Sequence, residues 1–356
     1  MWPSEFLFII LSSINVSQHY WNVMIGFPSI LEGIEDLNRE QVEQLLHRAQ
    51  ELKLGSPARL PLKRKISVAT SFLENSTRTK LSFEMAIKKL EGIHINFDAE
   101  KSSLKKGESL EQTLLTLFYQ GIDICIVRTT ETRLLEQFKD YPPIKIINGG
   151  DGTNQHPTQA LLDLFTLKEY FKGELAAKKI CIVGDCTHSR VTHSLMDLLP
   201  LFGMQITLCG PKEFMPSHLP SSDLIKVSDD LEGTLKNSDA IYLLRIQNER
   251  HEESFDMSTY NQQWGINVER LIRVGKEAGK VPPIFHPGPA NIGIEVDSEI
   301  INSDLWMAHK QVENSIYIRM AIIEAMITNG DTKIGARYNK ISALKGLTEN
   351  DESKFR

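Results

Sequence analysis

The stretch "ISVATSFLENSTRTKLSFEMAIKKLEGIHINF", Ile66 to Phe97, decides the fold class. It begins and ends with β-branched runs, 66–72 and 93–97, that are typical of buried strands. Between them, apolar residues recur at i, i+3, i+4 and i+7 from Phe83, the spacing of one apolar helix face. The stretch therefore predicts a strand, a helix and a second strand, which is the unit from which parallel sheets are built.

The same alternation continues along the chain. Further runs that predict strands lie at 122–127, 144–148, 179–185, 205–210, 240–244 and 282–285. Helical patterns occupy 109–120, 157–171 and about 311–328. Near-continuous apolar strands alternating with helices favour an α/β fold with two doubly wound parallel-sheet domains linked by interdomain helices. We expect one domain at 28–157 plus about 309–330, a second at 158–308, and a polar tail at 331–356.

Composition limits the classes of function. The 356 residues are 41% hydrophobic and 24% charged, as in soluble globular proteins. A net charge of −6 argues against a general binder of nucleic acid or membranes, so any anion needs a local basic cluster. The four cysteines are scattered without a CxxC pair, and His188 and His193 lack the helical spacing of metal ligands. We predict no metal site and a cytoplasmic protein with reduced thiols.

The first 27 residues require a separate interpretation. The run "FLFIILSS" (6–13) resembles a signal-peptide core, but no Lys or Arg occurs before Arg39. A secretory signal needs a basic start, and the run is too short to span a bilayer. We expect residues 1–27 to be an N-terminal extension that is disordered or lies ahead of a native start at Met24. A membrane anchor is the alternative.

The helix that follows the first strand begins with an unusual charge pattern. Arg78 and Lys80 lie in its first turn, where the helix dipole already concentrates positive charge. Ser76, Thr77 and Thr79 add hydroxyls to the unpaired backbone N–H groups there, a set of donors suited to a phosphate dianion. The alternative is an ordinary Ser/Thr cap with a surface arginine. No GxxxxGK[ST] or GxGxxG motif is present, which disfavours a nucleotide P-loop.

Three more arginines follow predicted strands. Arg128 comes directly after "DICIV", Arg245 after "AIYLL" with Gln247 close behind, and Arg190 lies between a strand and the next helix. Ligands of open α/β sheets bind beyond the carboxyl ends of the strands. A single arginine at such a place is usually a surface charge. Three in an acidic chain indicate binding of carboxylate or phosphate groups.

Two further segments place polar groups at strand ends. In "GDGTNQHPTQALLDLF", Pro157 fits the first helical position, so His156 lies at the helix mouth and Gln159 one turn inside. His156 is either a structural residue or a donor to a substrate carbonyl. "FHPGPAN" follows the last strand, and its irregular backbone around Gly288 and Pro289 leaves carbonyls that can accept from a ligand NH₂ group.

Together these segments resemble the aspartate carbamoyltransferases, a branch of the aspartate/ornithine carbamoyltransferase superfamily. The resemblance extends from about Leu31 to Ile327 and rests, in order, on "STRT", "SLKKGES", "VR", "GDGTNQHPTQALLDL", "SRVTHSL", "RIQNER" and "HPGP". "RIQNER" is similar to the R-x-Q-x-E-R of the aspartate branch. The ornithine branch typically has a cysteine in its "HCLP" segment, where this chain has "HPGP" around Gly288.

The resemblance implies a role for each of these residues. Carbamoyl phosphate would be bound by Ser76, Thr77, Arg78, Thr79, Ser102 (or Ser103), Lys106, Arg128, His156, Gln159, Gly288 and Pro289. L-Aspartate would be bound by Lys106, Arg190, Arg245 and Gln247. The catalytic set would be Arg78, Thr79, Arg128 and His156, acting on the phosphate and the carbamoyl C=O without a cofactor.

The family's catalytic unit is a homotrimer, so Ser102 and Lys106 are expected to enter the active site of a neighbouring subunit. The implied reaction gives N-carbamoyl-L-aspartate and phosphate, a step of pyrimidine biosynthesis. The alternatives are a carbamoyltransferase for another amine such as ornithine, or a silent paralogue that binds a phosphorylated ligand. The sequence leaves open a regulatory chain, a dihydroorotase partner, nucleotide regulation, and the effect of Ile292, where many relatives have arginine.

Overall fold

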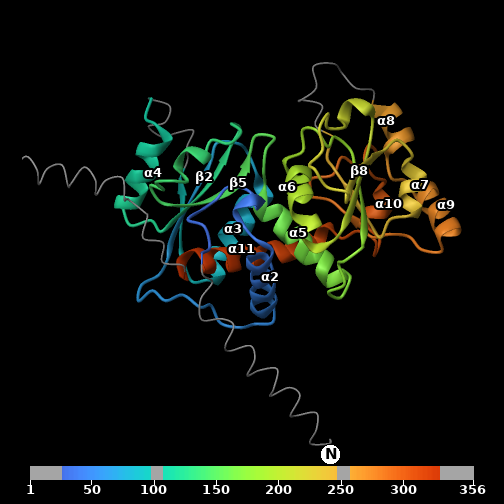
Figure 1. The fold of residues 1–356 in the computed structure, drawn as a ribbon. Coiled ribbons are helices and arrows are strands. Elements are labelled where there is room, and N and C mark those ends of the chain that lie inside the picture. Colours follow the sequence, from blue (N-terminus) through green and yellow to red (C-terminus); the bar gives the residue numbers. More distant parts are fainter. Residues whose placement is uncertain (1–25, 98–106, 247–256, 329–356) are drawn as a thin grey trace, which may run out of the picture.

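The computed structural model describes residues 26–97, 107–246 and 257–328 (Figure 1). Within these ranges, ten strands form two five-stranded sheets, and every pairing between named strands is parallel. The sheets occupy separate lobes (Figure 1). The predicted α/β class with two parallel sheets is therefore confirmed.

The first sheet has the strand order β1-β5-β4-β2-β3. Its strands are β1 (Ile30–Leu31), β2 (Ser67–Phe72), β3 (Ile93–Phe97), β4 (Ile124–Thr129) and β5 (Lys145–Asp151). Helices α2 (Arg39–Lys53), α3 (Thr77–Lys89) and α4 (Leu110–Tyr119) accompany them. The register pairs Phe72 with Arg128 and Thr129 with Asp151, so the carboxyl ends of β2, β4 and β5 lie side by side.

The second sheet has the order β10-β9-β6-β7-β8. Its strands are β6 (Lys179–Val183), β7 (Gln205–Cys209), β8 (Ile225–Ser228), β9 (Ala240–Leu243) and β10 (Ile284–Phe285). Its helices are α6 (Arg190–Leu198), α7 (Leu231–Lys236), α8 (Met257–Trp264), α9 (Val268–Ala278) and α10 (Ser298–Ile301).

Short 3₁₀ helices occur in both lobes: η1 (Ile34–Asp36) and η4 (Glu136–Phe138) in the first, η5 (Leu199–Phe202) and η6 (Lys212–Phe214) in the second.

Helix α5 (Pro157–Tyr170) lies between the lobes, and α11 (Ala308–Thr328) runs from there beneath the first lobe (Figure 1). Every residue of α5 from Pro157 to Leu167 is buried, as expected for a helix enclosed on all sides. Helix α11 packs against α2, α3 and α5, although it follows the second sheet in sequence. A buried ion pair of 2.6 Å between Arg48 and Glu324 fastens α2 to α11.

Burial explains why most strands could be predicted from the sequence. All residues of β4 are buried, and a strand covered on both faces must be apolar on both. The strands β1 and β8 were not predicted. β1 has only two residues, and β8 is an edge strand whose Lys226 and Val227 are exposed, so neither forms a continuous apolar run. No helix in the described ranges has the length and apolarity needed to cross a membrane.

Candidate active site

A cleft of about 770 Å³ lies between the two lobes, beyond the carboxyl ends of strands from both sheets. The predicted site residues that line it are Ser76, Thr77, Arg78, Thr79, Arg128, His156, Gln159, Arg190, Arg245, Gly288 and Pro289. Ser102 (with Ser103), Lys106 and Gln247 lie outside the described residues. The structure thus brings together every predicted site residue that it describes, although they come from segments more than 200 positions apart.

The N-terminus of α3 forms one wall of this cleft. Ser76 is its N-cap residue, in extended conformation (φ −156°, ψ 101°), and its hydroxyl makes no capping hydrogen bond within the described residues. The first turn of this fully described helix contains Arg78 and Lys80 but no acidic residue. The unpaired N–H groups of a helix mouth and these cations are therefore available to an anion.

Arg78 lies against the segment 286–289 on the opposite wall. A Cβ atom added to Gly288 would be only 2.8 Å from Nε of Arg78, and Gly288 has φ +70°. The Gly288–Pro289 peptide bond is cis. A side chain at position 288 would therefore displace Arg78, in addition to straining the left-handed backbone.

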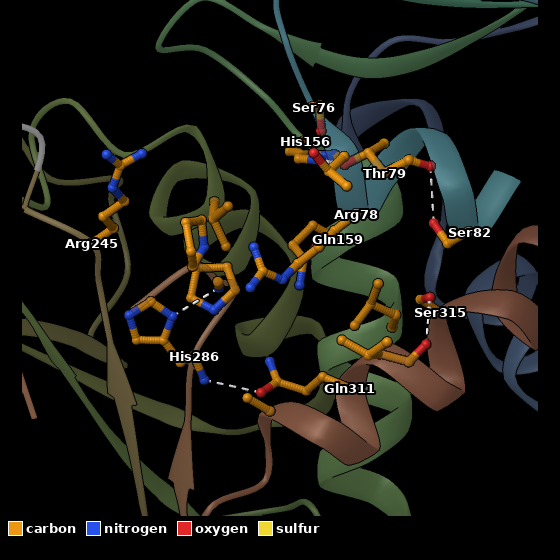
Figure 2. A pocket seen from close by; sticks show the side chains of 18 of the residues that line it. Ser76, Arg78, Thr79, Ser82, His156, Gln159, Arg245, His286, Gln311 and Ser315 are labelled. Atoms are coloured by element: carbon orange, nitrogen blue, oxygen red, sulfur yellow. Dashed lines mark hydrogen bonds between the residues drawn. The ribbon is translucent and has the colours of Figure 1, made fainter. Parts of the chain in front are cut away.

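His156 occupies the N-cap of α5, with Pro157 at the first helical position as predicted. Its backbone N–H donates to Oγ of Ser194 at 2.8 Å, and its Nε2 lies 3.4 Å from Oγ1 of Thr79. Nδ1 is buried and has no hydrogen-bond partner in the described ranges. Figure 2 shows Ser76, Thr79 and His156 gathered on one wall of the cleft.

The charge state of His156 follows from its surroundings. Burial, and then the positive charges of Arg128, Arg190 and Arg319, lower the pKa of His156 well below its usual value. The imidazole is therefore neutral near pH 7, with one ring N–H donor and one acceptor. Such a ring can donate a hydrogen bond to a carbonyl oxygen, but it carries no charge of its own.

Arg128 and Arg190 meet at a shared carboxylate that the sequence analysis missed. Glu74 accepts from Nη2 of Arg128 at 3.2 Å and from Nη1 of Arg190 at 2.8 Å. Both guanidinium groups pass close to Gly150, where an added Cβ would lie 3.2 Å from Nη1 of Arg128 and 3.1 Å from Nε of Arg190. Glu74 therefore joins an arginine of the first sheet to one at the N-terminus of α6.

The charge of Glu74 is secured by its partners. Burial raises its pKa, but the hydrogen bond and charge of Arg190, together with Arg128, outweigh burial and hold the pKa of Glu74 below its usual value. The available signal in the sequence was an acidic residue in the loop between strand and helix, two positions before Ser76.

Two buried charged residues next to the cleft were also missed. Asp163 lies one turn after Gln159 on α5 and accepts a hydrogen bond from Nε2 of Gln159 at 2.9 Å. Arg319 of α11 lines the cleft, and its guanidinium stacks 4.8 Å from the ring centroid of Phe83. Burial lowers the pKa of Arg319 to about 9, so it stays charged at neutral pH and adds to the positive potential around His156.

Arg245 enters the cleft from the second lobe, directly beyond β9. It lies across the cleft from His156 (Figure 2). Ile292 also lines the cleft and is 60% exposed. It therefore contributes an apolar surface at the rim and leaves the arginines named above as the source of positive charge.

The remaining chemistry of the cleft is limited by its residue types. The described residues contain no group of three or more His, Cys, Asp or Glu side chains arranged to hold a metal ion. Cys186 is buried beside the loop that carries Arg190, and burial followed by the charge of Asp185 raises its thiol pKa well above the usual value. A thiolate nucleophile is therefore disfavoured at this position.

Comparisons with known proteins agree with this geometry. Residues 31–169 match the family model described as "Aspartate/ornithine carbamoyltransferase, carbamoyl-P binding domain", and residues 176–326 match "Aspartate/ornithine carbamoyltransferase, Asp/Orn binding domain". The aspartate carbamoyltransferase catalytic subunit of Streptococcus suis is 38% identical over 298 residues, which cover 83% of this chain and 94% of the relative.

Solved structures show the same fold. The catalytic subunit of M. jannaschii aspartate transcarbamoylase has a TM-score of 0.72 at 32% identity, covering 84% of this chain and 98% of that one. The Trypanosoma cruzi aspartate transcarbamoylase in complex with N-(phosphonacetyl)-L-aspartic acid has a TM-score of 0.71 at 26% identity, covering 84% and 96%. Both family models and the curated relative cover most of the sequence, and on this basis the chain belongs to the aspartate/ornithine carbamoyltransferase family.

Proposed function

We propose that this chain transfers the carbamoyl group of carbamoyl phosphate to the amine of L-aspartate, giving N-carbamoyl-L-aspartate and phosphate for pyrimidine biosynthesis. The observation that carries the proposal is the convergence of Thr79, Arg128 and His156 on one cleft beside the cationic mouth of α3. The names of the relatives, and their complexes with carbamoyl phosphate and aspartate, support this choice of substrates.

In this proposal the phosphate of carbamoyl phosphate binds at the N-terminus of α3. Ser76, Thr77, Arg78 and Thr79 supply hydroxyl, backbone and guanidinium donors. The dianion provides the negative charge that the first turn of α3 lacks, which explains why cations are tolerated there. Residues 28–157 with about 309–330 form the carbamoyl-phosphate domain, a division supported by the packing of α11 on α2 and α3.

The carbamoyl C=O points to Thr79, Arg128 and His156. As the tetrahedral intermediate forms, negative charge develops on this oxygen, and donors already held in place stabilise it without reorganisation. Because His156 is neutral, its ring N–H acts as a polarising donor and Arg128 supplies the charge. Gln159 and the carbonyls near Gly288 and Pro289 accept from the carbamoyl NH₂ group.

Aspartate binds on the side of residues 158–308 through Arg190, Arg245 and Gln247. The two Nη atoms of Arg190 donate to Glu74 and to the carbonyl of Gly152, which fixes the plane of the guanidinium. An arginine has five N–H donors, so the fixed group can still bind a substrate carboxylate. Glu74 thus acts as a positioning residue for both Arg128 and Arg190.

No covalent intermediate with the protein is required. The unprotonated α-amine of aspartate attacks the carbamoyl carbon, the C–O bond to phosphate breaks, and the leaving phosphate takes the proton released by the amine. Holding both substrates in attack geometry can lower the barrier by about 7–11 kcal/mol. The high pKa of Cys186 agrees with a mechanism that uses no thiolate.

We further propose a cytoplasmic homotrimer in which Ser102 and Lys106 complete the site of a neighbouring subunit. The edge strand β3 supports an interface on the first lobe, because Ile93 and Ile95 are 45% and 39% exposed. The sedimentation coefficient at micromolar concentration tests this: a stable monomer with full activity would contradict shared active sites.

The decisive experiment is a steady-state assay of the purified full-length chain with carbamoyl phosphate and, in parallel, L-aspartate, L-ornithine and N-acetyl-L-ornithine. We expect carbamoyl aspartate with L-aspartate and no product with the other two amines. A preference for ornithine would mean that the chain is an ornithine carbamoyltransferase and that L-aspartate is not its acceptor. Binding of phosphate without any turnover would favour the silent paralogue.

A further inference from the structure

Helix α5 buries a carboxylate directly behind the cleft. Asp163 has no exposed surface. Its Oδ1 accepts from Nε2 of Gln159 at 2.9 Å and from Nε2 of Gln311 at 2.7 Å, and its Oδ2 accepts from the hydroxyl of Tyr242 at 2.6 Å. Three donors from α5, α11 and β9 thus converge on one carboxylate, which joins both lobes at the back of the site.

This carboxylate fixes the direction of both glutamine amides. Oδ1 of Asp163 accepts from both amides, so each glutamine turns its NH₂ group toward the carboxyl group. The reverse orientation would place an amide oxygen against a buried carboxyl oxygen. Gln159 lines the cleft (Figure 2), so its Oε1 is directed away from Asp163 as an acceptor for a ligand.

Gln311 also fixes the backbone of the segment 286–289. Its Oε1 accepts from the backbone N–H of His286 at 2.9 Å, the hydrogen bond drawn in Figure 2. Nδ1 of His286 in turn accepts from the backbone N–H of Gly288 at 2.8 Å. The N–H groups of this segment are therefore directed inward, and the cis Gly288–Pro289 stretch is held at the cleft by Asp163 through Gln311.

We propose that Asp163 is a positioning residue that makes the cleft selective for acyl phosphates bearing an NH₂ group. It holds Oε1 of Gln159 and the segment 286–289 as acceptors around the acyl substituent. A carbamoyl group can donate two hydrogen bonds there, whereas the methyl of an acetyl group can donate none. The inference rests on the proposed function, since it assumes that the carbamoyl group occupies this end of the cleft.

The carboxyl of Asp163 is about half ionised at pH 7, and Oδ1 can accept from both amides in either form, since a proton on Oδ2 leaves Oδ1 an acceptor. Burial raises its pKa to about 7, against the lowering effect of the hydrogen bonds from Tyr242, Gln311 and Gln159 and of the charge of Arg319. Loss of Asp163 would leave buried amide donors without an acceptor, which costs more than the hydrogen bonds contribute while they are formed.

The test uses two stable phosphonates that differ only in the group of interest. Phosphonoacetamide carries NH₂ where acetonylphosphonate carries CH₃, and both keep the carbonyl and the phosphonate. Their Kd values are measured by calorimetry for the full-length chain, for Asp163→Leu and Asp163→Asn, and for Tyr242→Phe as the matched control. Asp163→Leu removes the acceptors and keeps the branching at Cγ, whereas Asp163→Asn keeps one accepting oxygen.

We expect the parent chain to prefer phosphonoacetamide. Asp163→Leu should reduce that preference by about 10- to 100-fold, the effect of mispairing a buried donor. Asp163→Asn should reduce it less, and Tyr242→Phe should leave it unchanged because both glutamine bonds persist. Equal weakening of both phosphonates in Asp163→Leu would show a merely structural role and overturn the inference, as would an unchanged ratio.

Two further measurements keep the outcome decisive. If Asp163→Leu does not fold, Gln311→Met, which cuts only the link to 286–289, must lower the preference by about threefold or more; an unchanged ratio in this folded variant overturns the inference. A parent chain that binds both phosphonates equally and still forms carbamoyl aspartate also overturns it. A parent chain that binds neither phosphonate and forms no product instead contradicts the proposed function.

Discussion

Two walls of one cleft treat their polar groups in opposite ways. At the mouth of α3, Ser76 makes no capping hydrogen bond within the described residues, and Arg78 is exposed among unpaired N–H groups. At the opposite end, Asp163 accepts three hydrogen bonds and has no exposed surface. The first wall is left for a ligand to complete, whereas the second is completed by the protein itself.

The difference has an energetic basis. A cation near an exposed helix N-terminus costs only about 0.3–1 kcal/mol of folding stability, so the first turn of α3 can carry its cations without a bound anion. An unmatched buried carboxylate would cost several times more, so the wall around Asp163 must be satisfied before any ligand arrives. The cations that recognise the substrate charge thus lie where they cost the fold little stability. The groups that orient the substrate lie where the fold itself satisfies their hydrogen bonds.

The strongest challenge to this comparison is removal of His156, which lies with Thr79 on the α3 side of the cleft (Figure 2). We expect His156→Ala to lower kcat by about 10²- to 10³-fold, the usual cost of losing one preorganised donor to a developing oxyanion. The KM for carbamoyl phosphate should change little, because the α3 mouth remains intact. Initial rates over both substrates measure this. A raised KM with unchanged kcat would contradict the polarising role.

Removal of Arg245 tests the second lobe alone. Arg245→Ala should raise the KM for aspartate by about 10- to 100-fold through loss of a charge-assisted hydrogen bond, with a smaller effect on kcat. Arg39→Ala is the matched control, since the Arg39 side chain is 61% exposed, contacts Glu43 and the ring of Phe202, and does not line the cleft. Equal losses of kcat and affinity for both substrates would show that the walls are not separable in function.

Gly288→Ala tests the contact between the two walls, because the added methyl group would press on Arg78. The added Cβ would lie 2.8 Å from Nε of Arg78, so we expect the KM for carbamoyl phosphate to rise about five- to twentyfold. The left-handed backbone should also cost about 1–2 kcal/mol of unfolding free energy. Gly279→Ala is the control: Gly279 also has φ +70°, but a Cβ there meets no atom within 4 Å.

Those two variants should therefore lose similar stability, measured by urea unfolding, while only Gly288→Ala loses affinity. A normal KM in Gly288→Ala would mean that Arg78 can move aside without consequence. A raised KM in both variants would assign the effect to general strain, and the proposed contact between Arg78 and the segment 286–289 would then carry no functional weight.

The two walls also differ in how far the sequence predicted them. Arg78, Arg128 and His156 were found because a strand's carboxyl end is a local feature that a single stretch of sequence reveals. Asp163 appeared to be an ordinary polar residue within a helix, since its partners Tyr242 and Gln311 lie 79 and 148 positions away. Hydrogen-bond networks across lobes depend on tertiary packing, which no local pattern encodes.

The smallest expected effect concerns protonation of His156. Its folded-state pKa lies well below the usual value because of burial and the cations Arg128, Arg190 and Arg319. The unfolded chain binds a proton near pH 6.5 that the folded chain refuses, so stability should fall as pH drops below about 6.5, by up to about 1.4 kcal/mol per pH unit. Between pH 6.5 and 9 this residue should contribute no pH dependence, and NMR of the labelled ring should show a constant neutral form. Titration near pH 6.5 in the folded chain would mean that water reaches the His156 ring, and His156 could then act as a cation.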